Sequence, residues 1–138
     1  MKITSQIERN VVTIDEHSTA LDAAMLMTGK YIGALVVTGA WGIIGLFTER
    51  DLMMRVVGEQ QNPPDVVIKD VMSEKAVKVG PEETCERCLD LMKENRCRHL
   101  LVFDADEFVG IVSLRDIVAL MIEEREEMIS RLKEYISG

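Results

Sequence analysis

The chain carries one seven-residue pattern twice, as Gly45-Leu46-Phe47-Thr48-Glu49-Arg50-Asp51 and as Gly110-Ile111-Val112-Ser113-Leu114-Arg115-Asp116. In both copies a glycine is followed by two apolar residues, a threonine or serine, one further residue, and then Arg-Asp. Corresponding positions are 65 residues apart, as the positions of Gly45 and Gly110 show. Such a repeat indicates two copies of one supersecondary unit.

The same spacing aligns most of the chain without a gap. The further matched pairs are Val12 with Val77, Thr19 with Thr84, Leu26 with Leu91, Met27 with Met92, Leu35 with Leu100, Val37 with Val102 and, furthest back, Ile3 with Ile68. Between the copies, Glu59–Asp65 is polar and contains Pro63-Pro64, which cannot continue a helix. We therefore predict repeat 1 over residues 1–60 and repeat 2, with a C-terminal extension, over residues 66–138.

The order of elements is the same in both repeats. In the first, Val11–Ile14 is a short β-branched run and Thr19–Lys30 has helical apolar spacing behind a capping residue. Ala34–Thr38 and Ile43–Phe47 form a hairpin, and Thr48 caps a helix that reaches about Val57. The sequence predicts an α/β (α+β) fold of two β-α-β-β-α repeats. One such sheet is too small to bury both of its faces, so we expect the repeats to pack sheet to sheet about a pseudo-twofold axis.

The final helix is longer than its counterpart in the first repeat. It begins after Ser113 and is predicted to reach about Ile136. Its apolar stripe consists of Val118, Met121, Ile122, Met128, Ile129, Leu132 and Ile136, and Glu123–Glu127 faces solvent. This stripe either packs on a second subunit or closes the core of its own chain.

The repeated pattern resembles the CBS domain, named for cystathionine β-synthase, and the paired copies resemble a Bateman module. The resemblance covers almost the whole chain. It implies a module that binds an adenine nucleotide or a related adenosyl ligand between its repeats, with AMP, ADP or ATP ahead of NAD and S-adenosylmethionine. The chemistry is consistent, because a hydroxyl at a strand-to-helix junction and the following backbone N–H groups suit a phosphate. An aspartate three residues later can accept hydrogen bonds from a ribose diol.

The resemblance also implies two clefts, each using residues of both repeats, with adenine held near the start of a first strand. The first cleft takes Thr48, Asp51, Val77, Val79, Arg98, His99 and Arg115. The second takes Ser113, Asp116, Val12, Ile14 and Arg50. Gly33 and Ala34 stand where the first cleft has Arg98 and His99, so we predict unequal sites, with charged nucleotides preferring the first.

Composition excludes several classes of protein. The net charge of −8 disfavours binding to nucleic acid, which depends on many Lys and Arg contacts to phosphates. No apolar run approaches the roughly 20 residues of a membrane span, and the first residues do not resemble a signal peptide, so we expect a cytoplasmic protein.

The three cysteines, Cys85, Cys88 and Cys97, do not suggest a disulfide framework. A metal site of these cysteines with His99 is conceivable, but the repeat register places Cys85 and Cys88 opposite Ala20 and Ala23. That match favours small core residues, and we predict no required metal.

Three functions remain open at this point. The first is a stand-alone, non-enzymatic ligand sensor, expected to be a homodimer of parallel or antiparallel packing, that signals to an unidentified partner protein. The second is a structural dimerisation or scaffold module with degenerate clefts. The third is an enzyme, for which the sequence shows no nucleophile and base at suitable spacing and no nucleotide-hydrolysis motif.

Overall fold

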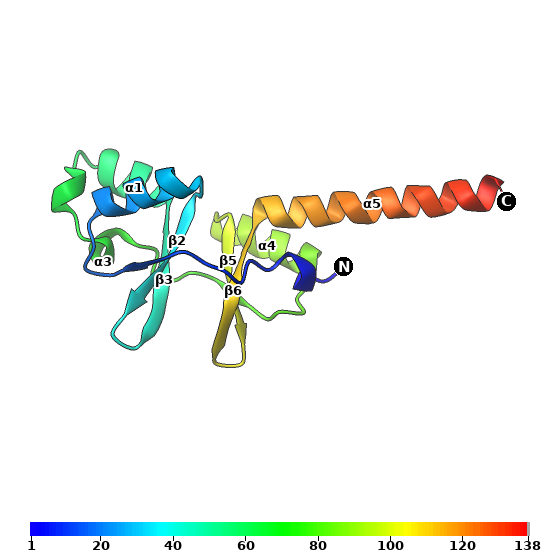
Figure 1. Ribbon diagram of the computed structural model, residues 1–138, viewed down its shortest axis with the longest axis horizontal. Helices are drawn as coiled ribbons and strands as arrows, with labels where there is room; N and C mark the ends of the chain where they lie inside the picture. The colour runs from blue at the N-terminus through cyan, green and yellow to red at the C-terminus, as the bar shows by residue number, and fades with distance from the viewer. Residues whose placement is uncertain (138) are drawn as a thin grey trace. The chain divides into compact units, whose positions relative to one another are not determined.

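The computed structural model describes residues 1–137 and contains two compact units, each with one three-stranded sheet (Figure 1). The first-repeat unit comprises Asn10–Ala76, and the second-repeat unit comprises Met1–Arg9 together with residue 77 onward. The predicted α/β class, the two repeats and the long C-terminal helix are confirmed. Sheet-to-sheet packing stays a prediction.

The first-repeat unit has the predicted order of elements. Its strands and helices are β1 (Thr13–Asp15), α1 (Ala20–Lys30), β2 (Ala34–Gly39), β3 (Gly42–Thr48), α2 (Glu49–Asp51), the π-helix η2 (Leu52–Val57), the 3-10 helix η3 (Pro63–Asp65) and α3 (Ile68–Val71). The sheet order is β1-β2-β3, with β1 parallel and β3 antiparallel to β2.

The second-repeat unit repeats this plan. Its elements are the 3-10 helix η1 (Thr4–Gln6), β4 (Lys78–Val79), α4 (Cys85–Asn95), β5 (His99–Asp104), β6 (Glu107–Ser113) and α5 (Leu114–Ser137). The sheet order is β4-β5-β6 with the same strand directions. Both hairpins have a register shift at matched positions, after Val37 and after Val102.

The first strand lies later than predicted. Val11–Ile14 was the expected range, whereas β1 spans Thr13–Asp15, because the strand is defined by its parallel pairing with Val36–Thr38 of β2. The predicted helix that follows Thr48 does reach Val57, but after Asp51 it widens into the π-helix η2.

The compact units differ from the predicted repeats at their N-terminal ends. Ile3 and Ile7 lie in the hydrophobic core of the second-repeat unit, whereas Ile68 and Met72 lie in the core of the first-repeat unit. Each repeat therefore begins with a segment that folds onto the other repeat's sheet. Burial of these apolar side chains, which are at most 9% exposed, explains why the units do not coincide with residues 1–60 and 66–138.

The two exchanged segments make matching hydrogen bonds. The N–H and C=O of Ser73 pair with those of Leu46 in β3, and Glu8 pairs in the same way with Ile111 in β6. Ile111 and Leu46 directly follow the glycines of the repeated pattern. A Cβ at Gly45 would lie 2.5 Å from the Ser73 carbonyl oxygen, and a Cβ at Gly110 would collide with the Glu8 carbonyl oxygen. The repeated glycine is thus required for close approach of the exchanged segment.

Candidate functional site

The strand-to-helix junction after β3 is a capping box. The Thr48 side chain accepts a hydrogen bond from the Asp51 N–H at 3.2 Å, while the Thr48 N–H donates to the Asp51 carboxylate at 2.9 Å. The Thr48 hydroxyl also donates to this carboxylate at 3.1 Å. A reciprocal pair of this kind satisfies two backbone donors at a helix start and holds both side chains in place.

The junction after β6 has the same geometry. The Asp116 N–H donates to the Ser113 hydroxyl oxygen at 3.1 Å, and the Asp116 carboxylate accepts from the Ser113 N–H at 3.1 Å and from its hydroxyl at 2.7 Å. The sequence prediction that each hydroxyl residue lies beside the aspartate three positions later is confirmed in both units. Their contact with a ligand stays a prediction.

The two aspartates nevertheless have different surroundings. Asp51 is 7% exposed, and its two carboxylate oxygens accept hydrogen bonds from the Ser73 hydroxyl at 3.0 and 3.1 Å. The Arg55 Nε lies 3.7 Å from this carboxylate. Asp116 is only half-buried, and the residue that matches Ser73 in its unit is Glu8, which has no hydroxyl group. The Asp51 carboxylate is therefore held by more intramolecular donors than that of Asp116.

Sequence reasoning missed Ser73. Its hydroxyl reaches Asp51 because the segment after α3 pairs with β3. The 65-residue spacing aligns Ser73 with Glu8 and so marks them as corresponding positions. Nothing in the sequence showed that the segments carrying these residues pair with β3 and β6.

Basic residues gather at one junction. In the second-repeat unit, His99 pairs in register with Ser113, and the Arg98 carbonyl accepts from the Leu114 N–H at 2.8 Å. Arg98 and Arg115 are exposed and His99 is half-buried. This end of the sheet therefore carries two guanidinium groups and an imidazole beside a capping hydroxyl.

The matching end of the first-repeat sheet lacks two of these three basic side chains. Ala34 pairs in register with Thr48, and the Gly33 carbonyl accepts from the Glu49 N–H at 2.9 Å. These positions correspond to His99 and Arg98, as the repeat alignment predicted. Arg50, which matches Arg115, is exposed.

Four of the predicted ligand contacts lie at the start of the first strands, and the first two are Val12 and Val77. The Val12 carbonyl accepts from the Val36 N–H at 3.0 Å, and the Val77 carbonyl accepts from the Leu101 N–H at 2.9 Å. Both therefore lie at the same end of the sheet as the capping residues of their units, on the opposite edge strand.

Ile14 and Val79 are each 7% exposed and belong to the two hydrophobic cores. Along an edge strand the backbone N–H and C=O groups of successive residues point alternately toward the sheet and away from it. In β1 and β4 the residues whose backbone groups point away from the sheet are Thr13 and Lys78. Backbone contacts from these strands to a ligand would therefore come from Thr13 and Lys78, which the sequence prediction omitted.

Each predicted cleft takes residues from both compact units. The structure brings together Thr48, Asp51, Val12 and Arg50 in one unit, and Ser113, Asp116, Val77, Arg98, His99 and Arg115 in the other. The assembly of Thr48 with Arg98, or of Ser113 with Val12, stays a prediction.

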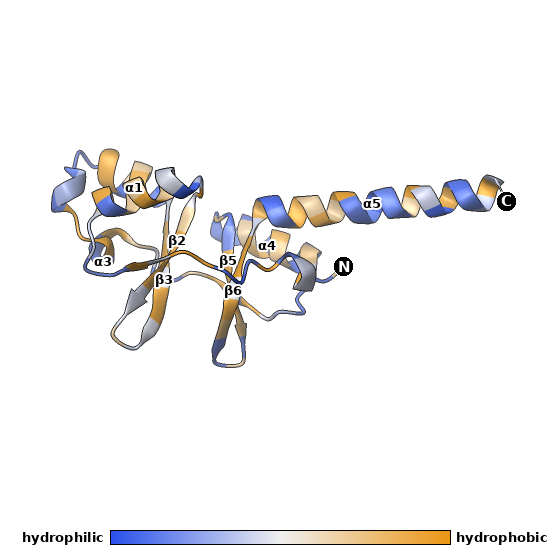
Figure 2. Ribbon diagram, viewed as in Figure 1, coloured by the Kyte–Doolittle hydropathy of each residue, from blue (hydrophilic) through white to orange (hydrophobic). Residues whose placement is uncertain are grey.

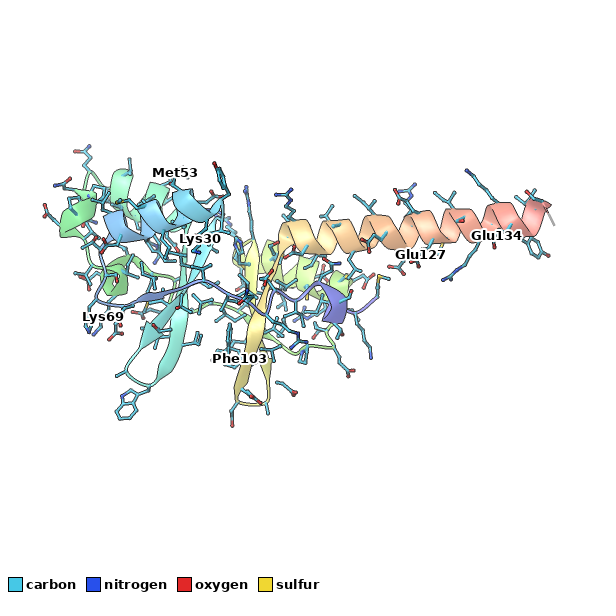
Figure 3. The ribbon with its side chains drawn as sticks, viewed as in Figure 1. Lys30, Met53, Lys69, Phe103, Glu127 and Glu134 are labelled. Carbon is cyan, nitrogen blue, oxygen red and sulfur yellow. The ribbon has the colours of Figure 1, made fainter. Side chains whose placement is uncertain are left out.

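An open depression of about 370 Å³ lies at the far end of the second sheet. It is lined by Lys78, Val79, Gly80, Phe103, Ala105 and Asp106. The Lys78 Nζ lies 4.7 Å from the centre of the Phe103 ring, which Figure 3 labels near the β5–β6 hairpin. Apart from Val79, this depression shares no residue with the predicted clefts, and it lies toward the hairpin turn rather than the capping junction.

The cysteines of the Cys85-x-x-Cys88 segment are core residues, as the repeat register predicted. Both are fully buried on α4, in the same cluster as Leu100 and Ile117. Burial raises the pKa of the Cys88 thiol to about 11 and also raises the pKa of Cys85. Within residues 1–137 no group of three or more His, Cys, Asp or Glu side chains is arranged to hold a metal ion. No helix in this range has the length and apolar character to cross a membrane.

Both repeats match a known family of domains. The family model of the CBS domain matches residues 5–58 and 68–123. The chain is 34% identical over 125 residues to the mitochondrial CBS domain-containing protein CBSX3 of Arabidopsis thaliana; this match covers 87% of the chain but 61% of the plant protein.

Among solved structures, a protein with CBS domains from Burkholderia ambifaria superimposes with a TM-score of 0.84 at 30% identity, covering 89% of this chain and 95% of that one. The hexameric CBS-CP12 protein of bloom-forming cyanobacteria superimposes with a TM-score of 0.77 at 28% identity, covering 86% of this chain and 69% of that one.

Proposed function

Because the chain belongs to the CBS domain family, we propose that it is a non-enzymatic regulatory module that binds an adenine nucleotide and signals to a partner protein. AMP, ADP and ATP are the preferred ligands, ahead of NAD and S-adenosylmethionine. The ligand lies in a cleft made by both repeats, in a protein that works in the cytoplasm. The observation that carries the proposal is the duplicated capping junction, in which a hydroxyl and a carboxylate are held together in each unit.

The charge at these junctions supports a phosphorylated ligand. Although the protein as a whole is acidic, three basic residues lie at one end of the second sheet: Arg98, His99 and Arg115. The guanidinium groups of Arg98 and Arg115 can form paired hydrogen bonds with phosphate oxygens. The matching positions Gly33 and Ala34 offer no such groups. A cleft that takes Arg98 and His99 therefore binds charged nucleotides more tightly than its counterpart.

The environment of Asp51 modifies the expected role of the two aspartates. For Asp51 to accept a ribose diol, the sugar must share or replace the hydrogen bonds from Ser73. Asp116 carries no such serine at the matched position and is more exposed. Sugar recognition by Asp116 therefore requires less rearrangement, whereas phosphate recognition favours the cleft with Arg98.

A thermal-shift series on the full chain tests the proposal, after any co-purified ligand has been removed. Ligand at 100 times its Kd should stabilise the protein by about 2.7 kcal/mol, which is a rise in Tm of roughly 5–10 °C. Arg98→Ala and Arg115→Ala alter exposed side chains and should greatly reduce the response to ATP. Arg87→Ala, on the exposed face of α4, serves as the matched control.

Two results would contradict nucleotide sensing. One is a flat response to AMP, ADP, ATP, NAD and S-adenosylmethionine. The other is an ATP response that Arg98→Ala and Arg87→Ala reduce equally, because such a response would not depend on the basic residues at this end of the sheet.

Exposed apolar side chains support a homodimer. Met25 on α1 is 66% exposed, and Met53 and Val57 on η2 are 60% and 61% exposed (Figure 3 labels Met53). Large side chains at such positions are typical of protein–protein contacts. Sedimentation of the full chain should give twice the mass of one chain, and a monomer at all concentrations would contradict this part of the proposal.

The scaffold function remains the second candidate, because one observation favours it. The Asp51 carboxylate is nearly buried and already bonded to Thr48 and Ser73, as expected of a purely structural capping group. A dimer that shows no response to any adenosyl compound would support this function.

A further inference from the structure

The C-terminal half of α5 has no covering structure within the described chain. Every residue from Arg125 to Ser137 is exposed, and Figure 1 shows α5 continuing past α4 of the same unit. Large apolar side chains are nevertheless present here, with exposed fractions from 44% for Ile129 to 86% for Tyr135. Figure 2 shows apolar and polar segments alternating along the helix. Because isolated helices of this length are marginally stable in water, contact with a partner would stabilise this part of α5.

The apolar residues form one continuous stripe. Ile122, Ile129 and Ile136 recur every seven residues, and Leu132 lies between the last two. Val118, Met121, Met128 and Tyr135 complete a stripe that covers roughly 140° of the helix circumference. Seven-residue recurrence is the spacing that packs one helix along another. The acidic face opposite the stripe, which includes Glu127 and Glu134 labelled in Figure 3, disfavours an anionic membrane as the partner.

Each border of the stripe carries charged residues in the same order. The first border carries Glu126 and, seven residues later, Lys133. The second border carries Glu124 and, seven residues later, Arg131. Each border thus has an acidic residue nearer the body of its unit and a basic residue nearer the end of the helix.

We propose that residues 122–136 of α5 pair antiparallel with the same helix of a second copy of this chain, centred near Ile129. In an antiparallel pair each border lies against the same border of the second copy, and the two run in opposite directions. Glu126 then lies beside Lys133 of the second copy, Glu124 lies within a turn of Arg131 of the second copy, and both contacts occur twice. The proposal rests on the homodimer part of the proposed function and is independent of nucleotide binding.

A parallel pair would place like charges together. The first border would then face the second border at the same level, with Glu126 near Glu124 and Lys133 near Arg131. Arg125, which interrupts the stripe, would also face its own copy. In the antiparallel pair the two Arg125 residues are about 12 Å apart along the axis, given a rise of about 1.5 Å per residue and a centre at Ile129.

Cysteine cross-linking of the full chain tests the direction of the pair. Single variants Ile122→Cys, Ile129→Cys and Ile136→Cys are oxidised with oxidised glutathione and run on a non-reducing gel beside the unaltered protein. We expect a cross-linked dimer for Ile129→Cys and at least fivefold less for either other variant alone. Mixing Ile122→Cys with Ile136→Cys chains should restore the cross-link.

The other outcomes overturn the proposal in distinguishable ways. Equal cross-linking at all three positions would establish a parallel pair. No cross-linking in a protein that sediments as a dimer would mean that the dimer uses a different surface, leaving the homodimer part of the proposed function intact. A monomer in sedimentation would overturn both.

Charge exchange provides an independent test. Lys133→Glu should weaken association of the copies about tenfold, because it places two glutamates together at two symmetric contacts. The double variant Glu126→Lys with Lys133→Glu should restore association to within about twofold. Glu123→Lys makes the same charge change as Glu126→Lys but on the solvent face, and it should have little effect on association. Stronger association of Lys133→Glu would overturn the antiparallel arrangement, since a parallel pair would gain a contact with Arg131.

Discussion

Replacing Gly45 with alanine should disrupt the exchanged segment of the first-repeat unit. The added Cβ would lie 2.5 Å from the Ser73 carbonyl oxygen and 3.5 Å from the Glu74 Cα. Both neighbours are backbone atoms, so no side-chain rotation relieves the collision. The segment around Ser73 must therefore move by about 1 Å to restore ordinary van der Waals contact.

The expected cost follows from what this movement breaks. Two backbone hydrogen bonds join Leu46 and Ser73, at 3.2 and 2.8 Å, and each contributes about 1 kcal/mol net. The movement also disturbs Met72, which is 6% exposed, in a core where overpacking costs about 1–3 kcal/mol. We expect Gly45→Ala to reduce the free energy of unfolding by about 2–4 kcal/mol.

Urea denaturation followed by circular dichroism measures this change. Gly110→Ala is the matched variant in the other unit, because its Cβ would meet Glu8, and a similar loss is expected. Gly29→Ala is the control, since a Cβ at Gly29 in α1 meets nothing within 4 Å. Better helix propensity should make this control about 0.5–1 kcal/mol more stable. If Gly45→Ala were as stable as the unaltered protein, the exchanged segment would not lie against β3 as described.

Three further predictions concern Ser73 and the cysteines. Ser73→Ala removes a donor to the Asp51 carboxylate and should lower the free energy of unfolding by about 1–2 kcal/mol in urea, whereas no change would mean that water replaces the hydroxyl without cost. Burial keeps the Cys88 thiol protonated up to a pKa of about 11, against 9.0 for the exposed group, so the unfolded state ionises first as pH rises. Stability should therefore fall by about 2 kcal/mol more between pH 9 and 11 in the unaltered protein than in Cys88→Ala, and parallel pH profiles would contradict this. Iodoacetamide at pH 8 should modify the half-buried Cys97 well before Cys85 or Cys88, as peptide mass spectrometry would show, and equal rates would mean that α4 opens readily.

The local elements were predictable because short-range physics determines them. Ser18 or Thr19 was expected to open a helix ending near Lys30, and α1 spans Ala20–Lys30 with Thr19 and Asp22 in a capping box. The hairpin strands were placed to within a residue at most ends, since apolar runs flanked by glycines leave few alternatives.

The candidate site was predictable in part. The pairing of Thr48 with Asp51, and of Ser113 with Asp116, follows from a three-residue spacing on a helix. The extra hydrogen bond from Ser73 to Asp51 could not be inferred, because it joins residues 22 positions apart through a sheet contact.

The repeated glycine illustrates the difference between the two sources of information. Its presence in both copies of the pattern identified the repeat, but its purpose depends on which segment crosses the sheet beside it. Sequence patterns determine secondary structure, caps and the existence of two repeats, since these depend on neighbours within a few turns or strand residues. Only the tertiary structure decided that Ile3 and Ile7 pack against the second repeat's core and that Ile68 and Met72 pack against the first. Each segment is apolar enough for either core, so the decision belongs to long-range burial, which no local pattern encodes.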